Sequence, residues 1–223
     1  MEKILSILRP CPLFGQISDA DLPGLLRCLN ARVVFFARDA VVLGQGDAVQ
    51  HIGVVLSGAV QIVRLDYFGH RSVLAHITPA QLFGEAFACA GVDALPVSAV
   101  AAQETQVLFL DSQRILNACA SPCAFHRQLI FNLMQILATK NLLLHQKIEI
   151  TSRRTTRDKL LAYLLDQAQQ QHSHAFDIPY DRQALADYLQ VERSGLSAEI
   201  SKLRSEGILT CRRNHFVLLQ PIE

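Results

Sequence analysis

Hydrophobic residues change their spacing along the 223-residue chain, and each change predicts a different kind of structure. Between residues 4 and 28 they recur at helical spacing, and Ser18 and Asp19 are placed to cap a leucine-rich helix. Between residues 32 and 111, short runs of Val, Ile, Phe and Leu alternate with glycines. That texture is typical of the short strands and turns of a sandwich or jelly-roll barrel.

Two runs are the plainest strands of this β-domain. Residues 51–63 (HIGVVLSGAVQIV) form a long apolar run, and residues 72–77 (SVLAHI) form a shorter one. The sequence Asp-Tyr-Phe-Gly at residues 66–69 supplies a turn between them.

Beyond residue 111 the apolar spacing fits one long helix, from about residue 122 to residue 150. Its apolar stripe consists of Leu129, Leu133, Ile136, Leu137, Leu143, Leu144 and Ile148. At 1.5 Å per residue such a helix is roughly 40 Å long, which is more than one barrel can cover. A stripe that outruns its own domain usually packs against a copy of itself, so the sequence predicts a homodimer. The alternative is that the stripe packs only on the barrel and on the C-terminal domain.

A helix-turn-helix follows a polar break in the chain. Residues 151–157 are polar and β-branched, which weakens helix propensity and predicts a hinge. Asp181 is a good N-cap for a helix over residues 182–189. Residues 190–193 then make the tight connection to a second helix that begins near Ser194.

The second helix of this pair has two contrasting faces. At 100° per residue its apolar side consists of Leu196, Ile200 and Leu203. The opposite side consists of Ser194, Ser197, Ala198 and Ser201. A helix that enters a major groove needs such small residues for close approach, whereas a solvated helix normally carries long charged residues on its outer face. We interpret it as a recognition helix; the alternative is that these are ordinary surface residues of a structural helix-turn-helix.

Long hydrogen-bond donors flank this small polar face. Arg193 stands at its start and Lys202 at its edge. An arginine can bond guanine O6 and N7 with two parallel donors, so Arg193 is our candidate for base reading. The hydroxyls of Ser194, Ser197 and Ser201 can reach bases or phosphates.

A basic hairpin completes the DNA-binding pattern. Gly207 stands at the expected C-cap position of the recognition helix. Residues 208–210 and 216–219 then predict two strands, and the tip between them carries Arg212 and Arg213, which are suited to phosphate contact. These features predict a winged helix-turn-helix.

The amino-acid composition indicates a well-packed protein but gives no support to DNA binding. Half of the residues are hydrophobic and 18% are charged, as in a well-packed soluble protein. No apolar run approaches the roughly 20 residues that span a bilayer, and the N-terminus lacks a signal-peptide pattern, so we expect a cytoplasmic protein with no membrane partner. The net charge is +1, and residues 151–223 carry 10 Lys and Arg against 9 Asp and Glu, so DNA contact must come from a local arrangement of charge. The six scattered cysteines predict thiols rather than a disulfide framework.

Taken as a whole, the sequence resembles the cyclic-AMP receptor / fumarate-nitrate reductase regulator (CRP/FNR) family. The matching segments are Gly46-Asp47, Leu56-Ser57-Gly58, Phe83-Gly84-Glu85 and Asp181-Arg182-Gln183-Ala184-Leu185-Ala186-Asp187-Tyr188-Leu189. The resemblance implies an α+β protein: an effector-sensing jelly-roll β-barrel of the cyclic nucleotide-binding type over residues 1–121, a dimerisation helix over 122–150, and a winged-helix DNA-binding domain over 151–223. It also implies transcription regulation at a near-palindromic operator, with RNA polymerase as a partner.

The resemblance also implies which residues read DNA. In the family, the positions of Arg193, Ser194 and Ala198 commonly contact bases. Ala198 lacks the polar group often found there, so we expect the operator to differ from the family's best-known sites.

The effector pocket departs from the family's cyclic-nucleotide pattern. Gly84 and Glu85 match the family's phosphate cassette, but Val97 stands where an Arg neutralises the cyclic phosphate, and Leu142 and Leu143 replace a Thr-Ser pair that contacts the purine. Losing a hydrogen bond to a charged group costs on the order of 1.5–3 kcal/mol, so both departures argue against cyclic AMP. We expect an unidentified apolar or weakly polar small-molecule effector. The expected pocket residues are Gly84, Glu85, Ala86, Val97, Ser98, Leu142 and Leu143.

Gas or redox sensing on the same fold is an alternative. His76, in a strand expected to line the barrel, could ligate haem, although a lone strand His is more often a hydrogen-bonded core residue. Cys119 and Cys123 could form a redox- or metal-sensing thiol pair, but small buried core residues are the other interpretation. Cys11 and Cys28 are 17 residues apart and do not form the close cluster of the family's iron–sulfur members.

The sequence also bears on two further function classes. A cupin-type enzyme needs two His separated by one residue, with a Glu and a further His, and His51, His70 and His76 do not reproduce that spacing. No Ser/His/Asp or P-loop pattern replaces it, so we assign no catalytic or metal-binding residue and expect a protein that is not an enzyme. The other class is an interaction protein whose winged helix no longer binds DNA, which the low net basicity keeps open.

Overall fold

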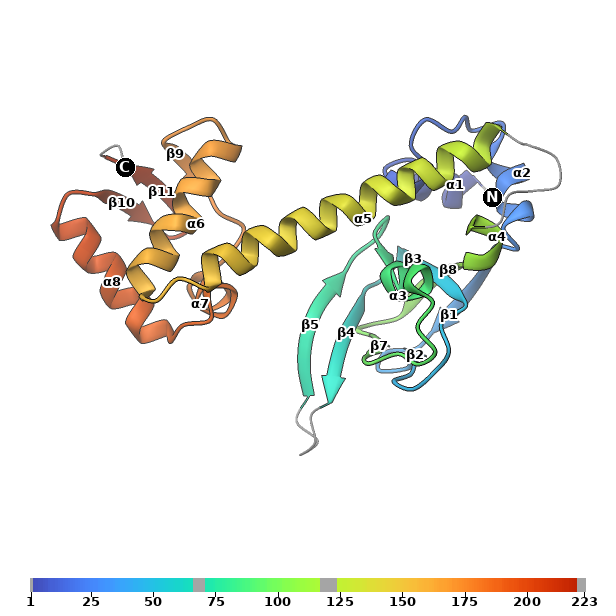
Figure 1. Ribbon diagram of the computed structural model, residues 1–223, viewed down its shortest axis with the longest axis horizontal. Helices are drawn as coiled ribbons and strands as arrows, with labels where there is room; N and C mark the ends of the chain where they lie inside the picture. The colour runs from blue at the N-terminus through green and yellow to red at the C-terminus, as the bar shows by residue number, and fades with distance from the viewer. Residues whose placement is uncertain (1, 66–70, 117–123, 220–223) are drawn as a thin grey trace. The chain divides into compact units, whose positions relative to one another are not determined.

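The computed structural model describes residues 2–65, 71–116 and 124–219 (Figure 1). The chain divides into two compact units, Met1–Thr139 and Lys140–Glu223, each with its own hydrophobic core. The turn predicted at residues 66–69 lies outside the described residues, as do His70, Cys119 and Cys123. Within the described ranges, no helix is both long enough and apolar enough to cross a membrane.

Three short helices begin the first unit: α1 (Glu2–Leu8), the 3-10 helix η1 (Pro12–Phe14) and α2 (Leu22–Cys28). The predicted capping of α2 by Ser18 and Asp19 is wrong, because the helix starts at Leu22 behind Asp21. Ser18 instead accepts a hydrogen bond from the Asp21 backbone N–H at 3.3 Å, in the turn before the helix. Pro23 stands in the first turn of α2, where its missing N–H costs the helix nothing, and this favours the later start.

Two four-stranded antiparallel sheets form the β-domain, with strand orders β1-β8-β3-β6 and β2-β7-β4-β5. The strands are β1 (Arg32–Phe36), β2 (Val41–Leu43), β3 (His51–Ser57), β4 (Val60–Leu65), β5 (Arg71–Ile77), β6 (Leu82–Phe83), β7 (Ser98–Ala101) and β8 (Thr105–Asp111). Two short helices, α3 (Glu85–Ala90) and α4 (Ser112–Leu116), follow β6 and β8. Side chains from both sheets share one buried cluster, which includes Val55, Val60, Ala101 and Val107. The predicted jelly-roll-like domain is confirmed.

The apolar run predicted as one strand over residues 51–63 is two strands. Gly58 has φ +80° and reverses the chain between β3 and β4. A Cβ at Gly58 would lie 2.3 Å from the backbone oxygen of Glu104, so no larger residue fits there. Thr105 holds the same turn, because its hydroxyl donates to the Ala59 carbonyl oxygen at 3.0 Å. The turn was not predicted because the apolar runs before and after it look like one continuous strand.

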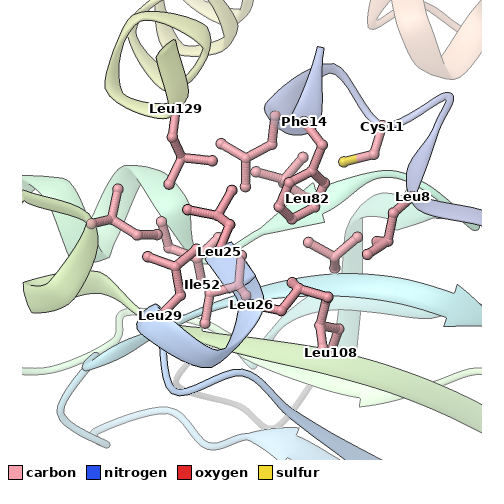
Figure 2. Close-up of a cluster of buried hydrophobic side chains, with 14 of the residues drawn as sticks. Leu8, Cys11, Phe14, Leu25, Leu26, Leu29, Ile52, Leu82, Leu108 and Leu129 are labelled. Atoms are coloured by element: carbon pink, nitrogen blue, oxygen red, sulfur yellow. The ribbon is translucent and has the colours of Figure 1, made fainter. Parts of the chain in front are cut away.

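The main core of the first unit joins the N-terminal helices to the sheet that contains β3 and β8. Figure 2 shows leucines of α2 meeting Ile52 and Leu108 of the sheet, with Phe14 and Leu129 closing the cluster. Its labelled members are Leu8, Cys11, Phe14, Leu25, Leu26, Leu29, Ile52, Leu82, Leu108 and Leu129.

The predicted long helix is α5 (Ala124–Thr151), with 28 residues. Its first half packs on the first unit through Leu129 and Leu133. The side-chain amide of buried Asn132 donates to the carbonyl oxygens of Leu13 at 3.0 Å and Gly15 at 2.8 Å. The predicted stripe is not uniform, since its later apolar members are exposed together with others on the helix: Phe131, Met134, Leu142, Leu143, Leu144 and Ile148.

Helices and a three-stranded antiparallel sheet form the second unit (Figure 1). The elements are α6 (Thr156–Gln170), β9 (Ala175–Asp177), α7 (Arg182–Leu189), α8 (Arg193–Ser205), β10 (Leu209–Arg212) and β11 (His215–Leu218), with strand order β10-β11-β9. Thr155 caps α6 by accepting from the Asp158 backbone N–H at 3.1 Å. The break between α5 and α6 therefore lies at residues 152–155, inside the segment predicted as a hinge.

Candidate DNA interface and effector pocket

The connection between α7 and α8 is fixed by local chemistry. Asp181 caps α7 as predicted, because its carboxylate accepts from the Ala184 backbone N–H at 2.8 Å. Gln190 ends the helix in the left-handed conformation, with φ 55° and ψ 54°. The chain turns sharply there, so α8 begins only three residues later, at Arg193.

Burial divides α8 into the two faces that the sequence predicts. Leu196, Ile200 and Leu203 are buried in the core of the second unit. The exposed candidates are Arg193, Ser194, Ala198, Ser201 and Lys202. Ser197 is only half-exposed and lies at the edge of the outer face.

The hydroxyls of the outer face are partly engaged with the helix itself. Ser201 donates to the carbonyl oxygen of Ser197 at 3.0 Å, and Ser205 donates to that of Lys202 at 2.8 Å. Each hydroxyl keeps acceptor capacity toward an external donor. Ser205 is an exposed residue that the sequence reasoning missed, although the same 100° count places it between Ser194 and Ala198.

The wing is a tight hairpin held at its base. Arg212 pairs with His215 across β10 and β11, and Arg213 adopts φ 58° at the tip. Asn214 donates to the carbonyl oxygen of Ile178 at 3.2 Å, and Nδ1 of His215 lies 3.1 Å from an Asp177 carboxylate oxygen. These contacts fix the hairpin on the β9 side and leave both arginines exposed.

Gly84 and Val97 line the same small hollow in the β-domain. Its other walls are Leu43, Ile62, Phe83, Phe87, Leu95 and Ala99. All of these lining residues are apolar, so no side chain of the hollow carries a cation or a hydrogen-bond donor for a phosphate group. The hollow is about 10 Å³ in volume, which is close to the space that one water molecule needs. A larger ligand would have to move its walls apart.

The other expected pocket residues do not line this hollow. Ser98 accepts a hydrogen bond from the Gln45 backbone N–H at 2.9 Å, Glu85 is buried in the first turn of α3, and Ala86 is exposed. Leu142 and Leu143 lie on the part of α5 that belongs to the second unit, and their side chains are 70% and 56% exposed. Two of the seven predicted residues are therefore brought together, and the sequence reasoning missed walls such as Ile62 and Phe87.

The candidates for gas or redox sensing are not grouped into a site in the described part of the chain. His76 is exposed on β5, which is the last strand of its sheet. Burial raises the pKa of the Cys11 thiol to about 11, which makes a reactive thiolate scarce at neutral pH. Among the described residues, no three His, Cys, Asp or Glu side chains are grouped so that they could hold a metal ion.

Solved structures share this architecture. A protein from Ruegeria pomeroyi described as a cyclic nucleotide binding protein is 22% identical, with a TM-score of 0.52 over 98% of this chain and 93% of its own. DNR from Pseudomonas aeruginosa is 22% identical, with a TM-score of 0.50 over 97% and 93%. CprK complexed with OCPA is 14% identical, with a TM-score of 0.65 over 88% and 89%. At these identities the likeness shows the fold.

Family models identify both parts of the sequence. Residues 33–121 match the cyclic nucleotide-binding domain, and residues 158–222 match the Crp-like helix-turn-helix domain. No curated protein matches the chain. Because these two domains follow one another and together cover more than half of the sequence, the chain belongs to the CRP/FNR family of transcription regulators.

Proposed function

We propose that the protein is a homodimeric, sequence-specific DNA-binding regulator whose β-domain binds a small neutral effector other than cyclic AMP. The outer face of α8 carries the DNA-binding part of this proposal, since Arg193 stands at the start of a row of small exposed residues. Small side chains let a helix approach base edges closely, and a guanidinium matches guanine O6 and N7. Lys202 and the wing residues Arg212 and Arg213 supply contacts to phosphates.

The lining of the hollow supports an effector without a phosphate. Val97 is 8% exposed, and its neighbours in the hollow are all apolar. A phosphate placed there would lose its hydrogen bonds to water without gaining a cation, which is costly. A neutral, mainly apolar molecule that opens the hollow fits these walls.

The exposed apolar residues of α5 support a dimer of this chain. Exposure of six large apolar side chains to water is unfavourable in free energy, and a second copy of the chain would bury them. Two copies along α5 would present two recognition helices to a near-palindromic operator whose half-sites are about 34 Å apart. Effector binding would then re-aim these helices.

A role in transcription regulation also implies a location, a protein partner and an output. The protein would work in the cytoplasm, beside its DNA target, and would contact RNA polymerase at the promoter. It needs no catalytic step, because occupancy of the operator is its output.

Selection of binding sites from random DNA, followed by titration at several salt concentrations, tests the DNA-binding proposal. We expect a near-palindromic site that binds at least about a thousandfold more tightly than random DNA, with affinity that falls as salt rises. Equal affinities for the selected and the random DNA would contradict it and would favour the interaction-protein alternative.

Calorimetry with cyclic AMP and a thermal-shift screen of neutral small molecules test the effector proposal. We expect no tight cyclic AMP binding and at least one apolar compound that raises the melting temperature. Tight cyclic AMP binding would contradict the proposal, and a Soret band after haem reconstitution would favour the gas-sensing alternative.

A further inference from the structure

Arg157 of α6 is joined to the recognition helix at two points. Its Nη1 lies 3.2 Å from Oε1 of Glu199, and its Nη2 lies 2.6 Å from Oε2 of Glu206. The side chains are partly shielded from solvent, with 31% of Arg157, 19% of Glu199 and 34% of Glu206 exposed. One guanidinium therefore holds the Glu199 carboxylate of α8 and the carboxylate of Glu206, the C-cap residue of the same helix.

The spacing of these carboxylates gives the contact its geometry. Glu199 and the C-cap residue Glu206 are seven residues apart, so they lie two turns apart on one side of α8. Because the guanidinium is planar and its donors have fixed directions, a fork of this kind restricts orientation more than a single charge contact does. Rotation of α8 about its own axis would break one or both contacts.

The contact also offsets negative charge on the side of α8 that carries Glu199 and Glu206. Two carboxylates on a DNA-reading helix would repel phosphates, and Arg157 offsets them. The hydrogen bond from Arg157 lowers the pKa of Glu206 below its ordinary value, as expected for a guanidinium that stabilises the ionised carboxylate. Arg157 is the second residue of α6, just after the break at residues 152–155, so the start of α6 and one side of α8 belong to one contact network.

We propose that Arg157 is a positioning residue that sets the orientation of the recognition helix for base reading, so that it determines sequence discrimination more than overall DNA affinity. This inference rests on the proposed DNA-binding function. A purely electrostatic role predicts something different: Glu199→Gln and Glu206→Gln would then strengthen binding to any DNA. A positioning role predicts that these substitutions weaken discrimination, as Arg157→Gln does.

The test measures affinity for the selected operator and for random DNA, and takes their ratio for each variant. Arg157→Lys keeps the charge but cannot fork to both carboxylates. Arg154→Gln is the matched control, because it removes the same charge three residues earlier from an exposed side chain for which the described part of the chain shows no ion pair. All measurements are made well below the melting temperature of each variant.

We expect Arg157→Gln, Arg157→Lys and Glu206→Gln to lower the ratio about three- to tenfold, and the double variant Arg157→Gln/Glu206→Gln to lower it no further than either single change. Arg154→Gln should leave the ratio unchanged. An unchanged ratio in Arg157→Gln, with wild type discriminating normally, would overturn the positioning role alone. A wild type that does not discriminate would overturn the proposed function and this inference with it.

Amide hydrogen exchange of the DNA-free protein gives a second readout. We expect Arg157→Gln to speed exchange in α8 more than in α7, whereas Arg154→Gln should change neither. Equal protection of α8 in wild type and Arg157→Gln would overturn the inference without reference to any operator.

Discussion

Gly24 and Gly195 occupy the same position in two different helices, the third residue of α2 and the third residue of α8. At both, a Cβ would meet no atom within 4 Å. Replacing either by Ala should stabilise the protein by about 0.5–1 kcal/mol, because Gly loses more backbone freedom in a helix. Only Gly195→Ala should also weaken operator binding, since the added methyl group lies on the helix that we propose enters the groove. Thermal unfolding and operator titration of both variants check this, and equal operator affinities would argue against close approach at Gly195.

The hydrogen bonds from Asn132 of α5 to the N-terminal segment should contribute strongly to the stability of the first unit. Asn132→Ala removes both hydrogen bonds to the carbonyl oxygens of Leu13 and Gly15 and leaves buried acceptors unsatisfied. We expect a loss of about 1–3 kcal/mol in the free energy of unfolding measured in urea. Gln135→Ala, an exposed change one turn along the same helix, should cost little. Equal losses in the two variants would show that the buried amide is not the cause.

Filling the hollow should remove the response to the effector. Val97→Phe adds volume to a hollow of about 10 Å³, so we expect a stability cost of about 1–3 kcal/mol from overpacking. Compounds that raise the melting temperature of the wild type should no longer do so. Val73→Phe places the same ring on the exposed face of β5 and should preserve the response. A normal shift in Val97→Phe would place the effector elsewhere.

Cys11 predicts a pH dependence at the alkaline end. Burial raises the pKa of its thiol from 9.0 to about 11, so the folded state favours the protonated form. The resulting stabilisation is fully present below pH 9 and is lost as the pH rises toward 11, with a slope of at most about 1.4 kcal/mol per pH unit. Urea unfolding of wild type and Cys11→Ala should show a difference that narrows over this range. A constant difference would mean that the thiol does not titrate in this way.

Local chemistry explains what could be predicted from the sequence. Three predicted features depend only on residues near one another in the chain, and all three are present in the structure. They are the long helix α5, the capping of α7 by Asp181, and the end of α8 at Gly207. The reversal at Gly58 was missed because the apolar runs before and after Ser57-Gly58 look like one strand, and the close backbone that excludes a side chain there belongs to Glu104, which is distant in the sequence.

Sheet topology explains why the effector pocket was harder to predict. Ile62 of β4 and Ala99 of β7 are register partners, although 37 positions separate them in the sequence. Phe87 reaches the same hollow from α3. Family resemblance pointed to Gly84 and Val97, but no periodicity along one strand could supply walls that come from several strands and a helix.

Base preference at the operator tests the central claim most directly. Wild type, Arg193→Ala and the control Arg27→Ala, an exposed arginine on α2, are titrated against the selected operator and against versions with each base pair changed in turn. We predict that Arg193→Ala loses about 1–3 kcal/mol of binding free energy on the operator and no longer distinguishes one guanine pair in each half-site, while Arg27→Ala behaves as wild type. Identical base preferences in wild type and Arg193→Ala would contradict the account.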